Sequence, residues 1–458
     1  MSNLLSFYHS LPYPLRVLAA SARGAYLRWW RYGPETERLV EEALERETWS
    51  AERWKAWQEE RLAWMLHHAA TQVPYYREQW SHRRRQGDRA SWEVLENWQV
   101  LEKSEVKKNP KAFVSEVHPQ FLFEDHTSGT TGTPLSVYMD RDSLHLWYAL
   151  YECRIRRWNG VSIHDPWGIM GGQLVTPVEQ YIPPYWVYNF SLNQLYLSTF
   201  HLHSDRAKDY VDALIKHRIS HLVVYPSSAG LLASFILDQG LNPPPLKVII
   251  SNAEMLTPRA RQIMSLAFHC PVRNTYGMGE YIFGASECEY GKMHIWPEAG
   301  ILEILSENGE ICHDNTEGEF IITGLLNPHM PFIRYRVGDR GSLGSGEACR
   351  CGRNLPLLGE IYGRANDMIT LPDGRKIFWI NPVFYNLPVQ EGQVIQLDLY
   401  TLHVRYVADK GFSDATEKEI IHRLRQRVGE EMHITLERVD TIPRGPNGKF
   451  QSVVSKIH

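Results

Sequence analysis

The sequence of 458 residues lacks any run of about eighteen consecutive apolar residues, the length that a membrane-spanning helix requires. Its N-terminal apolar stretch is interrupted by Arg16 and Arg23, so it does not fit the apolar core of a secretory signal. We therefore expect no membrane span. The stretch could lie on a membrane surface, although the simpler expectation is that it packs against the rest of the protein.

The chain also has few cysteines and a small net charge. Six cysteines in a chain of this length do not make a disulfide framework, which favours a cytoplasmic location. The net charge is only −4, which argues against nucleic acid as the main partner. Apolar residues make up 43% of the chain, enough to bury a core, and the length predicts a large domain together with a smaller one.

The order of the apolar patterns predicts an α/β fold. Residues 1 to about 115 are mainly helical in pattern, and the helical spacing is clearest over 36–71. Short apolar runs then alternate with helical patterns, and we expect strands at 222–225, 246–250 and 272–275. Because α/β sheets bind ligands at the carboxyl ends of their strands, these three strand ends are expected to form one site.

Strands and turns dominate after residue 300. A hairpin turn is expected at 372–374, and a helix over 414–428 begins with Asp414 and Glu417 in an arrangement similar to a capping box. The predicted organisation is a large N-terminal domain of layered sheets and helices, residues 1–363, followed by a small, mobile α+β C-terminal domain, residues 364–458.

One loop is rich in glycine and small hydroxyl residues. It contains, in order, Thr127, Ser128, Gly129, Thr130, Thr131 and Gly132. Its glycines allow sharp turns, and its N–H groups and hydroxyls can surround a polyphosphate. It is not a Walker A loop, because no Gly-Lys-Ser/Thr sequence follows. Considered alone, it could equally be a Ser/Thr-rich hairpin turn.

Four further motifs follow this loop. They are Tyr276-Gly-Met-Gly-Glu280, Tyr335-Arg-Val-Gly-Asp339, Gly363-Arg-Ala-Asn-Asp367 and Pro443-Arg-Gly-Pro-Asn-Gly-Lys449. Together, and in this order, the five segments resemble those of the AMP-forming adenylating superfamily, which contains acyl-CoA synthetases, peptide-synthetase adenylation domains and luciferases. The likeness covers essentially the whole chain and is greatest for the branch of phenylacetate-CoA ligase and CapK-like proteins. Any one motif by itself is a weak signal.

The resemblance implies a site that uses ATP and Mg²⁺. The loop from Thr127 to Gly132 would hold the β- and γ-phosphates, and Glu280 would bind Mg²⁺, which prefers carboxylate and phosphate oxygens. Lys449 would bridge the substrate carboxylate and the α-phosphate. The residues that would hold the nucleoside are Tyr276, Gly277, the backbone of Ala253 and Glu254, Asp339 and Arg364.

The implied activity is that of an ATP-dependent ligase, which forms an acyl-adenylate and transfers the acyl group to a thiol, most simply coenzyme A. Its partners would be a small carboxylic acid and the acceptor, and the C-terminal domain would rotate between the two steps. An amine acceptor, as in surface-polysaccharide or natural-product biosynthesis, is one alternative. A non-catalytic nucleotide-binding scaffold is another, against which the retention of Lys449 and Glu280 argues. The sequence indicates neither the acid nor the oligomeric state.

Three positions depart from the pattern of the resembled family. Thr133 stands where many relatives have lysine, Gly279 replaces the hydroxyl residue that commonly precedes the glutamate, and Asn366 occupies a hinge position usually held by Asp or Lys. The first change removes a cation near the pyrophosphate, and the second removes a contact with the α-phosphate. None of them affects the catalytic residues, so we expect a working site with altered detail.

A second set of residues suits a metal ion. Cys288, His294, Cys349 and Cys351 supply three thiols and an imidazole, a closed donor set for tetrahedral Zn²⁺. The two pairs lie about 55 residues apart, further than in a zinc finger, so the fold would have to bring them together. Similar positions occur in the CapK-like relatives that the sequence resembles. Because no ligand position remains for a water, the expected role is structural; the alternative is a buried thiol, an unrelated histidine and an incidental surface pair.

Overall fold

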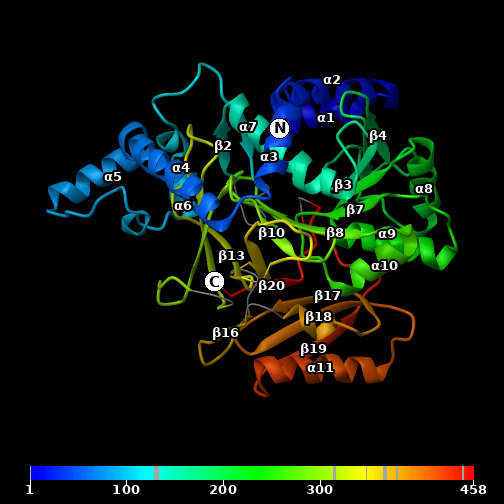
Figure 1. The fold of residues 1–458 in the computed structure, drawn as a ribbon. Helices are drawn as coiled ribbons and strands as arrows, with labels where there is room; N and C mark the ends of the chain where they lie inside the picture. The colour runs from blue at the N-terminus through cyan, green and yellow to red at the C-terminus, as the bar shows by residue number, and fades with distance from the viewer. Residues whose placement is uncertain are drawn as a thin grey trace.

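The computed structural model describes residues 2–127, 134–312, 316–346, 348–364, 369–377, 380–445 and 448–457. A large part is built from helices around a long mixed sheet, and a smaller C-terminal part with its own sheet lies below it in Figure 1. The predicted α/β class, with a large N-terminal part and a small α+β C-terminal part, is confirmed.

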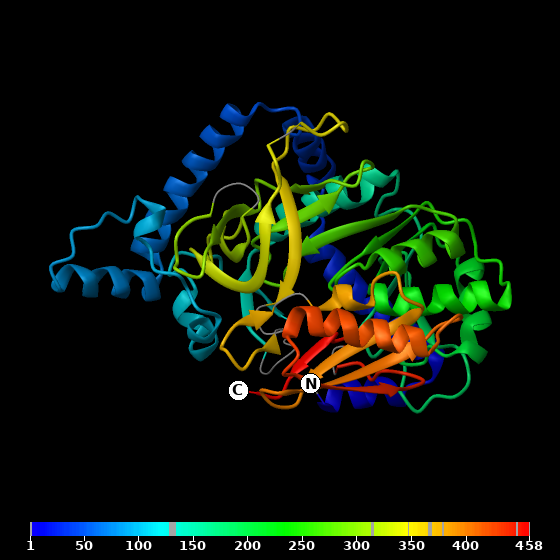
Figure 2. The same ribbon diagram turned by 90° about the horizontal axis from the view of Figure 1, so that it is seen from below.

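The N-terminal segment is helical, as predicted. Helices α1 and α2 lie along one edge of the large part, whereas α4 and α5 project from it in both views (Figures 1 and 2). The helix expected over 36–71 is interrupted, because the side chain of Ser50 accepts a hydrogen bond from the backbone N–H of Arg53 and caps a new helix. The helices are α1 Ser2–Ser10, α2 Tyr13–Arg31, α3 Thr36–Arg46, α4 Ala51–Gln72, α5 Pro74–Arg85 and α6 Lys103–Lys108.

Twelve strands of the described chain form one sheet, in the order β11-β12-β13-β14-β10-β9-β8-β7-β6-β3-β5-β4. From β5 to β8 the neighbours run parallel, and β6 and β7 are buried along their whole length, as expected of strands covered by helices on both faces. The elements of this half are α7 Arg141–Tyr151, β3 Trp167–Gly171, β4 Trp186–Asn189, β5 Gln194–Ser198, α8 Ala207–Lys216, β6 His221–Val224, α9 Pro226–Gln239, β7 Val248–Ser251, α10 Pro258–Phe268 and β8 Val272–Gly277.

The other half of the sheet is antiparallel. Its strands are β9 Gly284–Glu287, β10 Met293–Ile295, β11 Gly300–Leu305, β12 Gly318–Gly324, β13 Tyr335–Leu343 and β14 Leu357–Arg364. A separate hairpin, β1 Phe123–His126 and β2 Ser136–Met139, flanks the glycine-rich loop. In the strand order, β14 lies two positions from β9, and β13 lies three positions from it. Residues far apart in sequence therefore meet near the centre of the sheet.

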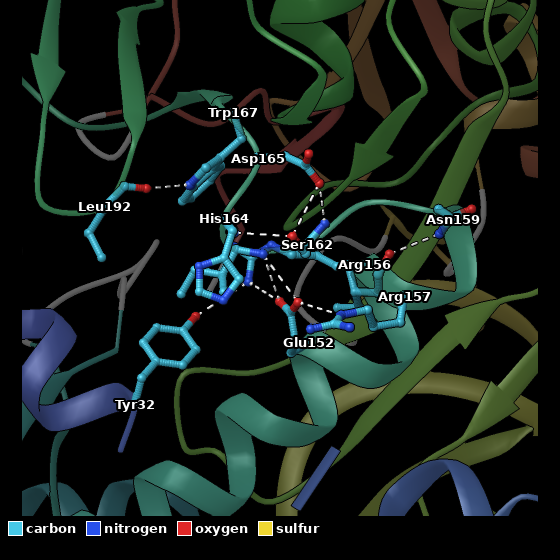
Figure 3. A network of polar contacts seen from close by, with 12 residues as sticks. Tyr32, Glu152, Arg156, Arg157, Asn159, Ser162, His164, Asp165, Trp167 and Leu192 are labelled. Carbon is cyan, nitrogen blue, oxygen red and sulfur yellow. Dashed lines mark hydrogen bonds and ion pairs between the residues drawn. The ribbon is translucent and has the colours of Figure 1, made fainter. Parts of the chain in front are cut away.

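A buried carboxylate joins the end of α7 to the start of the sheet (Figure 3). Glu152 is fully buried and accepts hydrogen bonds of 3.0 to 3.2 Å from Arg156, Arg157 and the backbone N–H of Ile163. Arg156 also donates to the hydroxyl of Tyr32, just after α2, at 3.3 Å. Loss of one partner from such a buried ion pair typically costs about 3–5 kcal/mol, so the network holds the residue after α2 close to the segment that leads into β3.

The C-terminal part has a sheet of order β19-β18-β17-β20, with α11 packed on it around a core of its own. Helix α11 covers the predicted residues, but its capping box is formed by Ser413 and Thr416 and not by Asp414 and Glu417. Ser413 lies in the extended conformation that an N-cap requires, one position before the predicted start. The elements are β15 Ile369–Thr370, β16 Lys376–Ile377, β17 Val389–Gln396, β18 Thr401–Ala408, α11 Asp414–Val428, β19 His433–Arg438 and β20 Val453–Ser455.

The domain boundary between residues 363 and 364 stays a prediction, because residues 365–368, including Asn366, lie outside the described residues. Within the described chain, no helix combines the length and the apolar character needed to cross a bilayer.

Candidate functional site

Three parallel strands, β6, β7 and β8, end side by side at one edge of the large sheet. The backbone N–H of Asn252 donates to the carbonyl of Val224 at 2.9 Å, which holds the loops after β6 and β7 together. The next residue, Ala253, has a φ of +66°. This left-handed conformation costs a non-glycine residue about 1–3 kcal/mol and is concentrated at functional sites. The strand ends therefore converge, as the sequence predicts.

Tyr276 and Asp339 meet at this edge. The hydroxyl of Tyr276, in β8, donates to Oδ2 of Asp339, in β13, at 2.6 Å. The Tyr276 ring packs edge-on against Phe283 and Phe320, with ring centroids 6.0 and 5.9 Å away. Asp339 lies opposite Arg364 in the β13–β14 ladder, although the side chain of Arg364 lies outside what the structure describes. Two of the predicted nucleoside-binding side chains are thus in direct contact.

Glu280 follows β8 and is buried. Its Oε1 accepts hydrogen bonds from Nζ of Lys103 at 3.0 Å and from the hydroxyl of Tyr335 at 2.9 Å. Lys103 begins α6 and was not predicted to belong to the site. In the sequence, Lys103 looks like an ordinary lysine at the start of a short polar helix. The sequence gives one hint of this role. Thr133 stands where many relatives have lysine, so another residue has to supply that positive charge.

Thr127 closes the ends of the glycine-rich loop. Its backbone N–H donates to the carbonyl of Leu135 at 2.9 Å, and its hydroxyl accepts a hydrogen bond from the N–H of Leu135 at 3.1 Å. A Cβ atom at Gly279 would lie 3.2 Å from Cα of Thr127, so glycine there allows this close approach. The loop is therefore closed directly beside the end of β8. The remaining predicted phosphate-binding residues lie outside the described residues; they are Ser128, Gly129, Thr130, Thr131 and Gly132.

The loop that carries Lys449 reaches the same edge from the C-terminal part. Nζ of Lys449 lies 5.8 Å from the centroid of the Tyr225 ring, directly after β6. Gly448 has a φ of +70°, and a Cβ atom there would lie 2.7 Å from Cα of Gly172, just after β3. Glycine is needed at this close approach, because any side chain would force the two parts apart.

Glu254 links the two parts of the protein. Its Oε2 accepts a hydrogen bond from the backbone N–H of Ser227 at 3.0 Å, and its Oε1 accepts one from the N–H of Phe450 at 2.7 Å. Burial raises the pKa of Glu254 above that of an exposed glutamate. The sequence suggested a role for the backbone of Glu254 only, whereas its side chain fixes the residue that follows Lys449.

Further contacts join the same two parts. Nζ of Lys410 pairs with Asp238 at 2.5 Å, and Arg259 pairs with Asp409. A cavity of about 150 Å³ lies between them, and its lining includes Glu254, Phe384 and Phe450. In this arrangement, Lys449 is held over the ends of the parallel strands.

The fold brings the two predicted pairs of metal-binding residues together. The ligand atoms of Cys288, His294, Cys349 and Cys351 all lie within 4.8 Å of one another. Sγ of Cys288 is 3.7 Å from Sγ of Cys349, and Sγ of Cys351 is 3.4 Å from Nε2 of His294. Strand β10 pairs with both β9 and β14, which explains how residues far apart in sequence meet.

The surroundings of this cluster orient its donors. Nδ1 of His294 lies 3.4 Å from the carbonyl oxygen of Leu355, which leaves Nε2 directed at the thiols. Arg353, next to the cysteine pair, donates to Glu47 at 3.2 Å and to Glu289 at 2.8 Å. Three thiols and an imidazole at these separations fit a tetrahedral Zn²⁺ site.

Comparison with known proteins gives matches over most of the chain. Residues 54–327 match the family described as AMP-binding enzyme, and residues 370–456 match the CapK C-terminal domain. Protein CapK of Staphylococcus aureus is 27% identical, over 78% of this chain and 79% of its own length. The phenylacetate-coenzyme A ligase of Pseudomonas putida is 26% identical, over 78% of this chain and 80% of its own length.

Solved structures share the fold. A 2-hydroxyisobutyryl-CoA ligase in the postadenylation state, in complex with 2-HIB-AMP, has a TM-score of 0.68 at 19% identity, covering 90% of this chain and 91% of that chain. The same enzyme in the thioesterification state, with 2-HIB-AMP and CoA, has a TM-score of 0.55 at 20% identity, over 90% and 91% of the two chains.

Proposed function

This chain belongs to the AMP-binding enzyme family, in the branch of CapK and the phenylacetate-coenzyme A ligases, and from this premise we propose that it activates a small carboxylic acid with ATP and transfers the acyl group to a thiol, coenzyme A. The observation that carries the proposal is the arrangement of Lys449, Glu280 and the Tyr276–Asp339 pair around the ends of β6 and β8. These groups come from three separate segments, which are the 276–280 motif, strand β13 and the loop of Lys449, and they suit the pyrophosphate, the nucleoside and the reacting carboxylate.

In the first step, a carboxylate oxygen attacks the α-phosphorus of ATP, and the bond to the bridging oxygen of pyrophosphate breaks. Two anions must approach each other, so a cation between them lowers the barrier. Lys449 supplies this cation, since its loop is fixed at the strand ends by Phe450 and Gly448. In the second step, the acceptor thiol gives up its proton to solvent and its sulfur attacks the acyl carbon. The bond from that carbon to the phosphate oxygen breaks, and AMP leaves with the bonding electrons.

Glu280 and Lys103 act on the pyrophosphate side. Both contacts of Glu280 in the described structure use Oε1, so the residue fits a role in which its second oxygen meets a Mg²⁺ ion held on the phosphates. Such an ion, when bound, would neutralise charge on the leaving group. Lys103 then supplies the cation that Thr133 does not, beside the closed ends of the phosphate loop at Thr127.

The nucleoside lies between the strand ends and β13. Asp339 accepts hydrogen bonds from the ribose hydroxyls, assisted by Arg364, and its orientation is fixed by Tyr276. The backbone of Ala253 and Glu254 borders the adenine beside Tyr276 and Gly277. The strained φ of Ala253 supports this assignment, because such strain is retained where close backbone approach to a ligand is needed.

The described arrangement of the two parts corresponds to the adenylation step. Lys449 faces the strand ends in it, and the higher TM-score to the postadenylation state of the 2-hydroxyisobutyryl-CoA ligase supports this assignment. The C-terminal domain, residues 364–458, then rotates near Asn366 to admit the acceptor.

Product analysis tests this proposal. The purified protein is incubated with ATP, Mg²⁺ and a panel of carboxylic acids, with coenzyme A or with a set of amines. We expect AMP and an acyl-CoA thioester from one class of acid. If amides form and thioesters do not, the acceptor is an amine and not a thiol. If ATP binds but neither product forms with any acid, the ligase assignment is wrong and a nucleotide-binding scaffold remains.

We also propose that Cys288, His294, Cys349 and Cys351 hold Zn²⁺ in a structural role. The donor set is complete without water, so the ion would not activate a nucleophile. It would join the β9–β10 hairpin to the segment before β14, on which Arg353 contacts Glu47 of the N-terminal helices.

A further inference from the structure

Helix α2 presents apolar side chains on the side that faces away from the protein. Leu15, Leu18, Ala22, Ala25 and Trp29 recur at intervals of three and four residues, and all five are exposed. Leu18 and Trp29 have exposed fractions of 61% and 52%. A surface helix normally presents charged residues to water along this side. The apolar stripe of α2 therefore requires an explanation other than packing within the chain.

The opposite side of α2 is fixed to the large part. Arg16 is buried and donates to the side chain of Gln180 at 3.0 Å. The hydroxyl of Ser21 accepts a hydrogen bond from the N–H of Phe190 at 3.1 Å, and Arg28 donates to the carbonyl of Ser191 at 3.1 Å. Because these contacts run along the helix, α2 cannot turn its apolar stripe inward.

The segments next to α2 also expose apolar side chains. Phe7 of α1 is 63% exposed, and Tyr181 and Ile182, in the loop before β4, are 76% and 74% exposed. Tyr8 donates to the carbonyl of Val175, which attaches α1 to that loop at 3.1 Å. Figure 1 shows α1, α2 and β4 at the end of the large part that lies away from α11. Exposed apolar side chains gathered in this way, and not scattered singly, mark an interaction site.

The charge around the stripe is positive. Residues 1–34 contain four arginines and no Asp or Glu, and two of the arginines, Arg23 and Arg28, are exposed. An α-helix turns by about 100° per residue, which places the exposed Arg23 and Arg28 on opposite sides of the stripe. The guanidinium of Arg141 lies 4.4 Å from the ring centroid of Trp29. The loop before β4 adds one acid, Glu179, which does not cancel these cations.

We propose that this surface, formed by α1, α2 and the loop 172–185, binds the face of an anionic phospholipid bilayer. The apolar stripe enters the boundary between headgroups and acyl chains, where Trp and Tyr side chains are favoured. Arg23 and Arg28 lie on the two sides of the stripe and contact lipid phosphates; Arg28 uses Nη1 on the carbonyl of Ser191 and binds a phosphate through its other N–H groups. A protein partner would need acids that match both arginines, whereas an anionic bilayer supplies negative charge on every side. The proposal is independent of the reaction at the strand ends.

Vesicle co-sedimentation of the full chain tests it. Vesicles of phosphatidylcholine alone are compared with an equimolar mixture of phosphatidylcholine and phosphatidylglycerol. We expect binding to the anionic vesicles and at least tenfold weaker binding for Leu18→Glu, because a charge replaces a side chain that enters the acyl boundary. Leu266→Glu is the matched control, since Leu266 is 54% exposed on α10, outside this surface. It should bind like the wild type.

The double variant Arg23→Gln/Arg28→Gln separates the two contributions. At about 1 kcal/mol per arginine, binding to anionic vesicles should weaken by roughly tenfold or more, and the remaining binding should depend less on salt. Thermal unfolding and nucleotide binding of each variant show that it is folded. Failure of the wild type to bind anionic vesicles at low salt would overturn the proposal. Equal binding by the wild type and Leu18→Glu would also overturn it. If the wild type self-associates, does not bind vesicles and loses its self-association in Leu18→Glu, the stripe is a contact between copies of the protein.

Discussion

Glu254 shows how one side chain can serve two parts of the protein. Its two carboxylate oxygens accept N–H groups from the start of α9 and from the residue after Lys449. A glutamine at this position offers one oxygen and an NH₂ group, so one of the two N–H groups loses its acceptor. A lost hydrogen bond with an unpaired group typically costs about 1–3 kcal/mol.

We expect Glu254→Gln to lower kcat/KM for adenylation by roughly tenfold, which corresponds to about 1.4 kcal/mol of the cost of the lost hydrogen bond. Glu430→Gln is the matched control, because Glu430 is 79% exposed on the C-terminal part. Burial raises the pKa of Glu254, so in the wild type acidification should reduce adenylation at a higher pH than an exposed glutamate would allow. This part of the pH dependence should be absent from Glu254→Gln. An unchanged rate and an unchanged pH profile would remove Glu254 from the positioning of Lys449.

The residues that sequence reasoning missed share a physical cause. Lys103 lies far from the motifs in sequence, and its contact with Glu280 depends on how α6 packs beside β13. No local pattern predicts such a contact, because spacing within a helix says nothing about distant strands. Glu254 was predicted to contact the nucleoside through its backbone, yet its side-chain role required the placement of the C-terminal part.

At the scale of elements, the cysteine and histidine cluster ties a hairpin to a crossing segment. Cys288 and His294 flank the turn between β9 and β10, and Cys349 and Cys351 lie between β13 and β14. Elements held mainly by a metal lose a large share of their stability without it, because binding energy contributes directly to folding.

The purified protein should contain zinc, and Cys351→Ser should lose most of it. We expect this variant to unfold roughly 10 °C lower, which corresponds to a loss of a few kcal/mol. Cys312→Ser changes a buried cysteine outside the cluster and should retain the metal. Elemental analysis and thermal unfolding measure both effects. Wild type that purifies without zinc, or Cys351→Ser that unfolds at the wild-type temperature, would refute the zinc site.

Element prediction succeeded where the local pattern is strong. The strands expected at 222–225 and 272–275 and the helix over 414–428 are present within a few residues. The helix expected over 36–71 is divided, because apolar spacing continues across the break while Ser50 starts a new helix. The capping residue of α11 was placed one position late, since Asp414 and Ser413 are both good N-caps and the backbone chooses between them.

At the scale of the whole molecule, two separately cored parts meet around one site. The large part supplies the strand ends, and the C-terminal part supplies Lys449 on a glycine-containing loop. The fold class followed from the order of patterns along the chain, whereas the meeting of the two parts depends on contacts such as that of Lys410 with Asp238, which no motif predicts. Under the proposed function, this division would allow one site to be used in two successive steps.

Acid-dependent exchange of labelled pyrophosphate into ATP reports adenylation by itself, because it requires reversible formation of the acyl-adenylate and no acceptor. Wild type should catalyse exchange with one class of carboxylic acid. Lys449→Ala should reduce the rate by about 10²–10³-fold, as expected when a group that stabilises transition-state charge is removed. Lys418→Ala, on the exposed side of α11, should exchange like the wild type. Exchange that persists in Lys449→Ala, or its absence in wild type that binds ATP, would contradict the account.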